Sequence, residues 1–287
     1  MNKPRNILKY LTNPLLLLPA VAIDIVFLIF PFFYGLYLSF MSSMKSPTFT
    51  LENYVYCFSG YSSMLLTTVE MAALITIILI VVSLPIAYFL AIKIKSDAIK
   101  TLILLVILAP FWIDWNIRTI AWYPVFGAGG FVSTIHLWIM HALGYHSVQP
   151  ISLLYTLISI IITWIQSYLL FMVVPIYLIL LRMDPTILKA ASTLRAGTFK
   201  TFYHITLKWS FPGIIIGSVF VFSLAMVDYA TPILIGGGLP TIGVTVWNLG
   251  RWVQWPKAMA MSMIILALIL VVIAVALRKV SVTRIIY

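Results

Sequence analysis

Four charged residues, Asp24, Asp114, Arg118 and Asp228, lie within or at the edges of long apolar runs. Placing a charge at the centre of a bilayer costs at least about 2.5–3.5 kcal/mol on insertion scales, so such residues usually face a cavity or a partner. Aromatic ring faces attract cations, and a carboxylate beside them strengthens that attraction. These residues therefore indicate either a path for a cationic substrate or charges that are neutralised inside the protein.

Asp114 and Arg118 are four residues apart, which places them on one helix face and predicts that they pair. The pair could serve only to neutralise itself, or it could line a substrate path. Aromatic residues surround it at Trp112, Trp115, Trp122 and Tyr123. These rings could instead form an interfacial belt, because they approach the outer end of their apolar run.

Asp24 and two prolines allow two interpretations each. Asp24 either lines the cavity or hydrogen-bonds to another helix, and the second interpretation is favoured. Pro175 and Pro232 are predicted to break their helices, because proline lacks the N–H that a helix interior needs. Such a break would make the segment from Asp228 to Pro232 a gate, although helix kinks without a transport role are common.

Other kinds of chemistry find no support in the sequence. His136, His141 and His146 are five apart, so they do not form the i, i+4 pair of a metal site, and no metal or cofactor is predicted. The sequence contains no Walker motif, so the chain cannot hydrolyse ATP itself. No basic block with interleaved aromatics indicates nucleic acid. The chain is therefore not predicted to be an enzyme.

The elements that position these residues follow from composition. The chain has 287 residues, of which 63% are hydrophobic and 9% are charged. A soluble domain carries about 25% charged residues, so lipid must be the solvent for much of this surface. Six apolar runs each exceed the ~18–20 residues that cross the bilayer as a helix. They lie at about 14–40, 66–92, 101–123, 151–181, 212–235 and 259–277.

The six runs predict an all-α integral membrane protein with one domain, residues 1–287, in the cell membrane. Fourteen of the 18 Lys and Arg residues fall on one side of this topology and three on the other. Because cytoplasmic loops are rich in Lys and Arg, both termini are predicted to be cytoplasmic. The fourteen are Lys3, Arg5, Lys9, Lys93, Lys95, Lys100, Arg182, Lys189, Arg195, Lys200, Lys208, Arg278, Lys279 and Arg284, against Lys45, Arg251 and Lys257.

Two connections between the runs are informative. Residues 124–150 carry no Lys, Arg, Asp or Glu but contain Phe131, Leu137 and Trp138, so they form a short helix in the outer interface or pack on the bundle. The cytoplasmic connection 182–211 is predicted to fold as helix, turn, helix. Asp184 and Pro185 suit a helix start, Gly197 suits its stop, and Thr198 suits the cap of a second helix that runs to Pro212.

The cytoplasmic connection resembles the coupling loop of ABC importer permeases. The resemblance rests on Lys189-Ala190-Ala191-Ser192-Thr193-Leu194-Arg195-Ala196, then on Phe202, Ile205, Leu207 and Pro212-Gly213. In that family the loop forms a helix that sits in a cleft of the ATPase subunit. The resemblance implies that the ATPase contacts are Leu188, Lys189, Ala190, Ala191, Leu194, Arg195, Ala196 and Phe199. From the residues alone, a structured loop and a docking helix are equally good interpretations.

Three positions of the loop depart from the family pattern, and each departure adds positive charge. Lys189 stands where the family has Glu, Arg195 where it has Gly, and Lys208 where it has Pro. The alanines and apolar positions keep their spacing. We therefore expect the ATPase partner of this chain to have a more acidic docking cleft than is usual in the family.

A second resemblance narrows the family to spermidine/putrescine-type permeases. It rests on Pro110-Phe111-Trp112, Arg118-Thr119, Ala121-Trp122 and Gly129-Gly130, and on Asp228-Tyr229-Ala230-Thr231-Pro232 with Gly236-Gly237. It implies the type I importer permease (MetI-like) fold and half of a pathway for a small solute, with polyamines expected. The expected pathway residues are Trp112, Asp114, Trp115, Arg118, Trp122, Asp228 and Tyr229.

The resemblance also implies partners. These are a second permease subunit, expected to be related but distinct, two ATPase subunits and an extracytoplasmic substrate-binding protein. The alternative substrates are other amines, opines, sugars or oxyanions. A structural membrane subunit or an intramembrane enzyme would explain the spans and the charge bias, but it would not explain the alanine-spaced loop or the two motifs.

Overall fold

A computed structural model of the chain describes residues 18–44 and 48–279. The predicted first run is described only from Leu18 onward. Lys3, Arg5, Lys9, Lys45 and Arg284, which contribute to the predicted charge bias, lie outside the described residues. The described part is helical apart from its loops and one isolated antiparallel bridge between Met41 and Phe49. This agrees with the all-α prediction.

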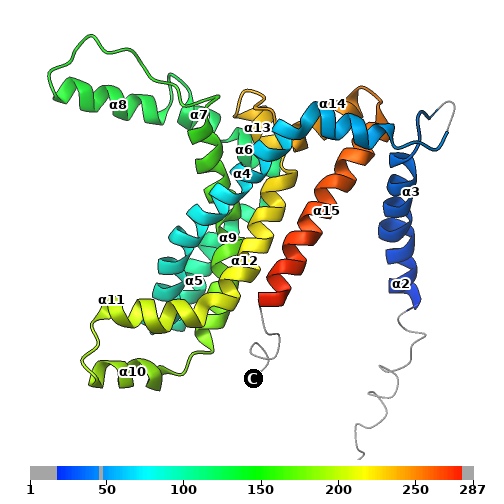
Figure 1. Cartoon of the computed structure of the whole chain (residues 1–287). Coiled ribbons are helices and arrows are strands. Elements are labelled where there is room, and N and C mark those ends of the chain that lie inside the picture. Colours follow the sequence, from blue (N-terminus) through cyan, green and yellow to red (C-terminus); the bar gives the residue numbers. More distant parts are fainter. Residues whose placement is uncertain (1–17, 45–47, 280–287) are drawn as a thin grey trace, which may run out of the picture. The chain divides into compact units, whose positions relative to one another are not determined.

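The helices follow one another in a simple order (Figure 1). They are α2 (Leu18–Asp24), η2 (Ile25–Ile29), α3 (Phe30–Ser39), α4 (Glu52–Tyr88), η3 (Phe89–Lys93), α5 (Asp97–Leu108), η4 (Ala109–Trp112), α6 (Trp115–Ile120), α7 (Tyr123–Phe126), α8 (Phe131–Ala142), α9 (Leu157–Leu181), α10 (Pro185–Thr193), α11 (Thr198–Thr201), η5 (Phe202–Thr206), α12 (Leu207–Val227), α13 (Ala230–Leu234), α14 (Ile242–Arg251) and α15 (Trp255–Lys279).

Six segments of the described chain are long and apolar enough to cross a membrane, which confirms the predicted number. Their bounds are Val21–Ser39, Glu52–Lys93, Trp115–Ala142, Leu157–Leu181, Thr198–Val227 and Trp255–Arg278. The chain divides into two compact units, Met1–Gly60 with Leu249–Ile264, and Tyr61–Asn248 with Ile265–Tyr287. We call them the small unit and the large unit. Helices α4, α14 and α15 each pass from one unit into the other.

In the small unit, polar contacts join the end of α3 to the start of α4. The side-chain amide of Asn53 donates to the carbonyl oxygens of Ser39, at 3.0 Å, and Met41, at 2.8 Å. The hydroxyls of Ser39 and Tyr54 are 2.7 Å apart. Asn53 is buried, and these bonds satisfy its amide where water is excluded.

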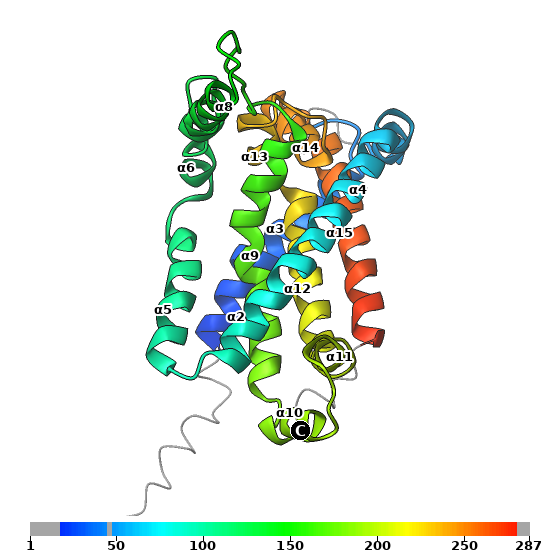
Figure 2. The same cartoon turned by 90° about the vertical axis from the view of Figure 1, so that its left-hand side faces the viewer.

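The core of the large unit is the packing of α12 against α9, which lie side by side in Figures 1 and 2. Gly213 lets the two backbones touch, because a Cβ placed there would lie 2.7 Å from the carbonyl oxygen of Pro175. The prediction that Pro175 breaks its helix is wrong, since α9 runs through it from Leu157 to Leu181. Proline is tolerated inside a membrane helix where a neighbouring helix packs against it, and α12 packs closely on α9 at this point.

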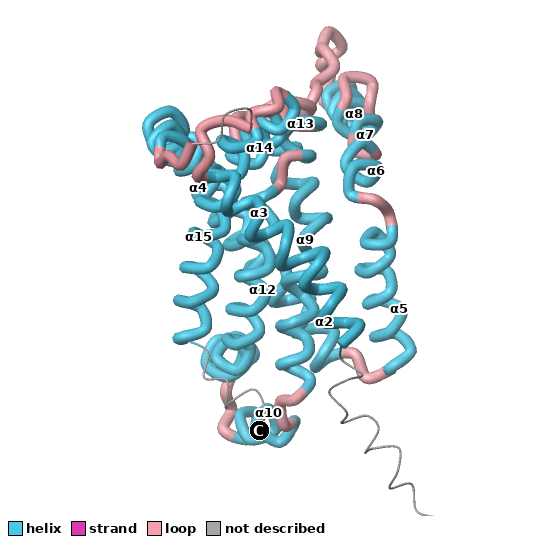
Figure 3. The backbone as a smooth tube through the Cα atoms, turned by 90° about the vertical axis from the view of Figure 1, so that its right-hand side faces the viewer, coloured by secondary structure: helices cyan, strands magenta, loops and turns pink. Residues whose placement is uncertain are grey.

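The apolar run at 101–123 is not one helix. Its first half forms α5 and η4, which end at Trp112, and α6 begins at Trp115. Figure 3 shows the loop that separates α5 from α6. Pro110 ends the α-helical hydrogen bonding, and the extended backbone of Ile113 and Asp114 then redirects the chain.

The large unit has two distinct ends. Helices α10 and α11 lie at one end, together with the turn between α4 and α5 (Figures 1 and 2). Helices α7, α8 and α13 lie at the opposite end. The connection 182–211 and residues 124–150 therefore lie on opposite sides of this unit.

Candidate functional site

The clearest polar site in the large unit surrounds Asp228, between the end of α12 and the start of α13. Asp228 is only 7% exposed. Its Oδ2 accepts hydrogen bonds from the indole N–H of Trp164, at 2.6 Å, and from the hydroxyl of Tyr168, at 3.3 Å. Its Oδ1 accepts from the backbone amides of Ala230, at 2.9 Å, and Thr231, at 3.2 Å. The carboxylate thus starts α13 and fixes two aromatic side chains of α9.

An aromatic column connects this carboxylate to Arg118. The Tyr168 ring lies 5.2 Å from the Trp115 ring, and the guanidinium carbon of Arg118 lies 4.8 Å from the Trp115 ring centre. Arg118 also donates to the carbonyl oxygen of Pro110, at 2.9 Å. The column joins α6, α9 and the α12–α13 junction, so three of the predicted pathway residues, Trp115, Arg118 and Asp228, belong to one structure.

Asp114 and Arg118 do not pair, which corrects the prediction. The Asp114 carboxylate caps α6 by accepting from the amides of Asn116, at 2.9 Å, and Ile117, at 3.3 Å. Within the described ranges the side-chain ion pair is Lys100–Asp97, at 3.3 Å. The helix starts at Trp115, so Asp114 precedes it as the cap and Arg118 turns inward toward Pro110.

The other predicted pathway residues lie apart from the column. Trp112 is 77% exposed, and Asp114 is exposed beside it. The Trp122 ring stacks on Phe126 at 4.8 Å. The Tyr229 ring stacks on Trp247 at 4.6 Å, with an angle of 10° between the planes. The helix break lies at Asp228 and Tyr229, before Pro232, which itself sits inside α13.

Trp164 and Tyr168 are the residues that the sequence-based site did not include. They are four apart in α9, so they share a helix face, and both are buried. Each carries one polar group on a large apolar ring, and such a group usually finds a partner when it is buried. This spacing within an apolar run was the signal that could have identified them.

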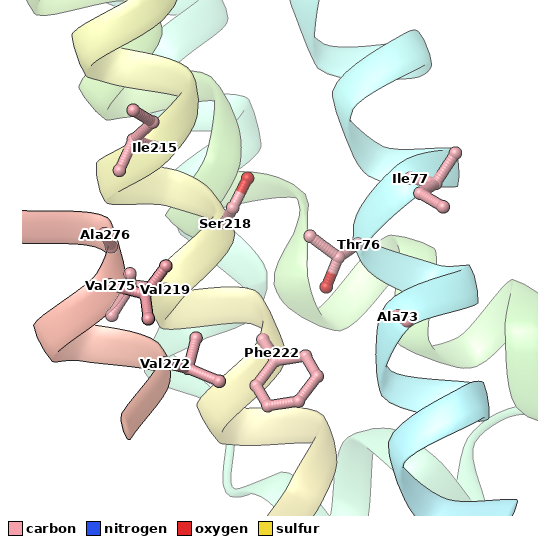
Figure 4. Close-up of a pocket in the computed structure, with 10 residues that line it drawn as sticks. All are labelled: Ala73, Thr76, Ile77, Ile215, Ser218, Val219, Phe222, Val272, Val275 and Ala276. Carbon is pink, nitrogen blue, oxygen red and sulfur yellow. The ribbon is translucent and has the colours of Figure 1, made fainter. Parts of the chain in front are cut away.

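The large unit also contains a cavity of 340 Å3 between α4, α12 and α15 (Figure 4). Its lining is apolar except for the hydroxyls of Thr76 and Ser218, which are already bonded to Ala72 and Ile214 within their own helices. No charged residue lines it, and none of the predicted pathway residues does. The residues that the structure describes contain no group of three His, Cys, Asp or Glu side chains suited to a metal.

The predicted start of the first helix in the connection 182–211 is confirmed, and we call this helix, α10, the loop helix. Asp184 caps α10 by accepting from the amide of Thr186, at 2.8 Å, and Pro185 occupies the first turn. The same backbone hydrogen bond lowers the pKa of Asp184 below its usual value, because it favours the charged carboxylate. The second predicted helix differs from expectation, since Gly197 precedes α11 and the helical path continues through Pro212 into α12.

The loop helix ends earlier than predicted, and Gly197 is not its stop. The amide of Arg195 donates to the carbonyl of Ser192 and the amide of Ala196 to that of Ala191, both at 3.0 Å. These two bonds define a Schellman motif, whose left-handed residue is usually glycine. Here that residue is Arg195, with φ of 53°.

The predicted ATPase contacts present a mixed surface. Leu194 and Phe199 are 83% and 82% exposed. Lys189, Ala190 and Arg195 are also exposed, whereas Leu188 and Ala196 are half-buried and Ala191 is buried. The exposed part therefore consists of two large apolar side chains flanked by cations.

Known proteins resemble the chain in sequence. The spermidine/putrescine transport system permease protein PotB of Haemophilus influenzae is 31% identical over 220 residues, which is 74% of each chain. PotB of Escherichia coli K12 is 32% identical over 197 residues, covering 68% of this chain and 69% of that protein. These relatives are transport permeases rather than enzymes. No protein-family model matches the chain.

A solved structure shows the same fold. A chain of a bacterial ABC transporter involved in the import of the acidic polysaccharide alginate aligns with a TM-score of 0.73. The alignment covers 96% of this chain and 97% of that chain, at 16% sequence identity. The chain therefore has the fold of that transporter chain.

Proposed function

The chain belongs to the permease subunits of ABC importers, of the spermidine/putrescine type, and on this premise we propose that it forms half of a translocation pathway for a polyamine. It is a multi-pass protein of the cell membrane. The match to PotB over 74% of both chains carries the substrate class. The other small solutes, amines, opines, sugars and oxyanions, are the alternative cargo of the same pathway.

The proposed complex contains a second, related permease subunit, two ATPase subunits and an extracytoplasmic binding protein. The bacterial alginate transporter was solved in complex with a periplasmic protein, and that assembly supports the analogy. The sequence contains no Walker motif, which supports the proposal that ATP is hydrolysed in a separate subunit.

In the proposed orientation both termini and the connection 182–211 are cytoplasmic. The arrangement of the large unit supports it, because the turn between α4 and α5 lies at the same end as α10 and α11 (Figure 2). That end carries Lys93, Lys95 and Lys100 as well as the basic residues of the loop. Positive charge concentrated at one end of a bundle is typical of the cytoplasmic side.

Within the pathway the predicted residues have two roles. Trp112 and Asp114 are exposed, so an aromatic face and a carboxylate can meet a cationic solute directly. Trp115, Arg118 and Asp228 belong to the aromatic column and position the helices around the path. Trp122 and Tyr229 are each stacked on a second ring. They directly precede α7 and α13, so they lie at the end of the large unit that holds these two helices.

The docking proposal rests on the exposed loop surface. Leu194 and Phe199 project apolar side chains that fit a hydrophobic recess, and Lys189 and Arg195 supply charges around them. An acidic rim on the ATPase cleft would complement those charges. The loop thus couples the permease to a partner of opposite charge.

Co-purification of the ATPase with the permease tests this assignment. Replacing residues 186–207 by a Gly/Ser linker should abolish ATPase binding, and binding that survives the replacement would make the coupling assignment wrong. The double variant Lys189→Glu/Arg195→Gly should weaken binding, and stronger binding would contradict the acidic cleft. Lys93→Glu/Lys95→Gly makes the same change of charge at the same end but outside the loop, and it should leave ATPase binding unchanged.

A further inference from the structure

Helix α8 buries the polar residue Ser133 and exposes large apolar residues. Ser133 is 1% exposed, whereas Trp138 is 73% exposed, and Phe131 and Ile135 are also exposed. Ser133 Oγ and His136 Nδ1 are buried, and neither has a hydrogen-bond partner among the described residues. A helix whose outer face meets water has the opposite arrangement. The outer face of α8 therefore needs an apolar neighbour.

Four of the exposed residues form one stripe along the helix. Phe131, Ile135, Trp138 and Ala142 recur at the spacing of a single α-helical face, and all four are exposed. Thr134 and His141, also exposed, border the stripe on one side. The stripe is continuous over the full length of α8, which runs from Phe131 to Ala142.

Charge and position identify the neighbour. Residues 124–150 contain no Lys, Arg, Asp or Glu, so no such charge opposes insertion of this segment into the membrane surface. Helix α8 lies at the end of the large unit that holds α7 and α13, and its axis runs across the direction of α9 (Figures 1 and 2). An uncharged helix with exposed Trp and Phe, lying across the ends of membrane spans, matches the headgroup zone of a bilayer.

We propose that α8 is an interfacial helix that inserts Phe131, Ile135 and Trp138 into the bilayer surface opposite the docking loop. The third crossing then runs through α5, η4 and α6, and the segment from Trp115 to Ala142 is not a spanning helix, despite its length and hydropathy. The turns that separate α6, α7 and α8 redirect the chain from the span into the interface. Lipid-anchored α8 would hold the outer end of α6, next to the aromatic column.

Nitroxide labels placed around α8 test the proposal. A Cys57→Ala background removes the single native cysteine. Ile135→Cys and Trp138→Cys sample the stripe, and Thr134→Cys and His141→Cys are exposed controls on its polar border. The permease, with the subunits that co-purify with it, is placed in phosphatidylcholine/phosphatidylglycerol nanodiscs, and collision of each label with oxygen and with a water-soluble nickel chelate is measured.

For each label we compare the rate of collision with oxygen to the rate of collision with the nickel chelate. This ratio should be several-fold higher for the labels at 135 and 138 than for those at 134 and 141. Ratios at 135 and 138 that are as low as the ratio of a water-exposed label would place α8 in water and overturn the proposal. A label at 138 that meets the nickel chelate until the liganded binding protein is added would identify a protein-docking face and would also overturn it. If Trp138→Cys does not fold, the label at Ile135→Cys is compared with the label at Thr134→Cys, and the same difference in ratio decides the proposal.

Discussion

Arg195 occupies a backbone conformation that glycine usually occupies at the end of a helix. A left-handed conformation costs a residue with a Cβ roughly 1–2 kcal/mol. Arg195 has φ of 53° and completes both hydrogen bonds of the Schellman motif. Strained residues of this kind concentrate at functional sites, where another interaction offsets the strain. The charge of Arg195, directed at the ATPase, is the interaction that we propose.

Substitution of Arg195 separates the backbone from the charge. Arg195→Gly should relieve the strain and slow hydrogen exchange of the Ala196 amide about fivefold, which corresponds to ~1 kcal/mol. Arg195→Ala keeps the strain and should leave that exchange rate unchanged. Both variants should bind the ATPase more weakly, because both remove the charge. Equal exchange in the two variants would mean that φ at this position is not strained.

Asp228 acts as an acceptor for four donors, which explains why a carboxylate is tolerated in a buried position. Two donors come from α9 and two from the backbone that starts α13. Hydrogen bonds to a charged group contribute about 1.5–3 kcal/mol each. A residue with this contact set holds helices in place, whatever else it does in the pathway.

Asp228→Asn should lower the thermal stability of the purified complex. The amide nitrogen of Asn cannot accept a hydrogen bond, so the donors facing it lose their partner at a cost of ~2–3 kcal/mol. Trp164→Phe removes one donor and should cost less. Thermal unfolding followed by intrinsic fluorescence compares the two variants. An Asp228→Asn protein that unfolds at the wild-type temperature but no longer transports would reassign Asp228 to direct substrate contact.

At the scale of elements, helix starts were easier to predict than helix ends. Asp184 and Pro185 predict the start of α10 because the first can cap a helix and the second suits its first turn, and the structure confirms this start. The end of α10 was misplaced because Arg195, rather than Gly197, takes the left-handed conformation, and side-chain type alone favours glycine. The interruption at Ile113 and Asp114 was missed because an apolar run carries no mark of where its helix stops.

One of the remaining errors has a local cause, and the others involve contacts between distant elements. The sequence placed Asp114 and Arg118 on one helix, but Asp114 lies just outside α6 as its cap. Pro175 was expected to break α9, yet the helix is continuous where α12 packs closely on it. The aromatic column joins residues about 50 to 60 positions apart, and no local pattern predicts which of them meet.

The glycine at the centre of the α9–α12 contact gives a prediction for packing. A Cβ at Gly213 would lie 2.7 Å from the Pro175 oxygen and 2.8 Å from the Ile176 Cα, so Gly213→Ala must push the two helices apart. Overpacking of this kind typically costs 1–3 kcal/mol, and the purified protein should melt at a lower temperature. Gly60→Ala is the control, because a Cβ there meets nothing within 4 Å. Equal melting temperatures for the two variants would mean that the helices are not in close contact.

At the scale of the whole molecule, composition and apolar run length were sufficient to predict a six-span membrane protein. The PotB relatives and the alginate transporter fold agree with that prediction. The order of hydrophobic runs does not depend on any individual residue, whereas the site around Asp228 depends on which residues of different runs are in contact. This is why the family could be identified from the sequence while Trp164 and Tyr168 were overlooked.

The orientation proposal predicts opposite accessibility at the two ends of the large unit. In the Cys57→Ala background, His146→Cys should react in intact cells with a membrane-impermeant maleimide. Lys200→Cys should react only after the membrane is permeabilised. Both native residues are exposed, so access rather than burial decides the result. The reverse pattern would place the connection 182–211 outside the cell.

ATP-driven uptake tests the central claim most directly. The permease, its partner subunits and the ATPases are reconstituted in proteoliposomes that contain ATP, and the binding protein is added outside with labelled spermidine or putrescine. The account predicts accumulation that requires ATP and the binding protein and that is lost when residues 186–207 are replaced by a Gly/Ser linker. ATP-dependent accumulation of a polyamine that survives this replacement would contradict the account. A complex that imports a different solute but accumulates neither spermidine nor putrescine would also contradict it.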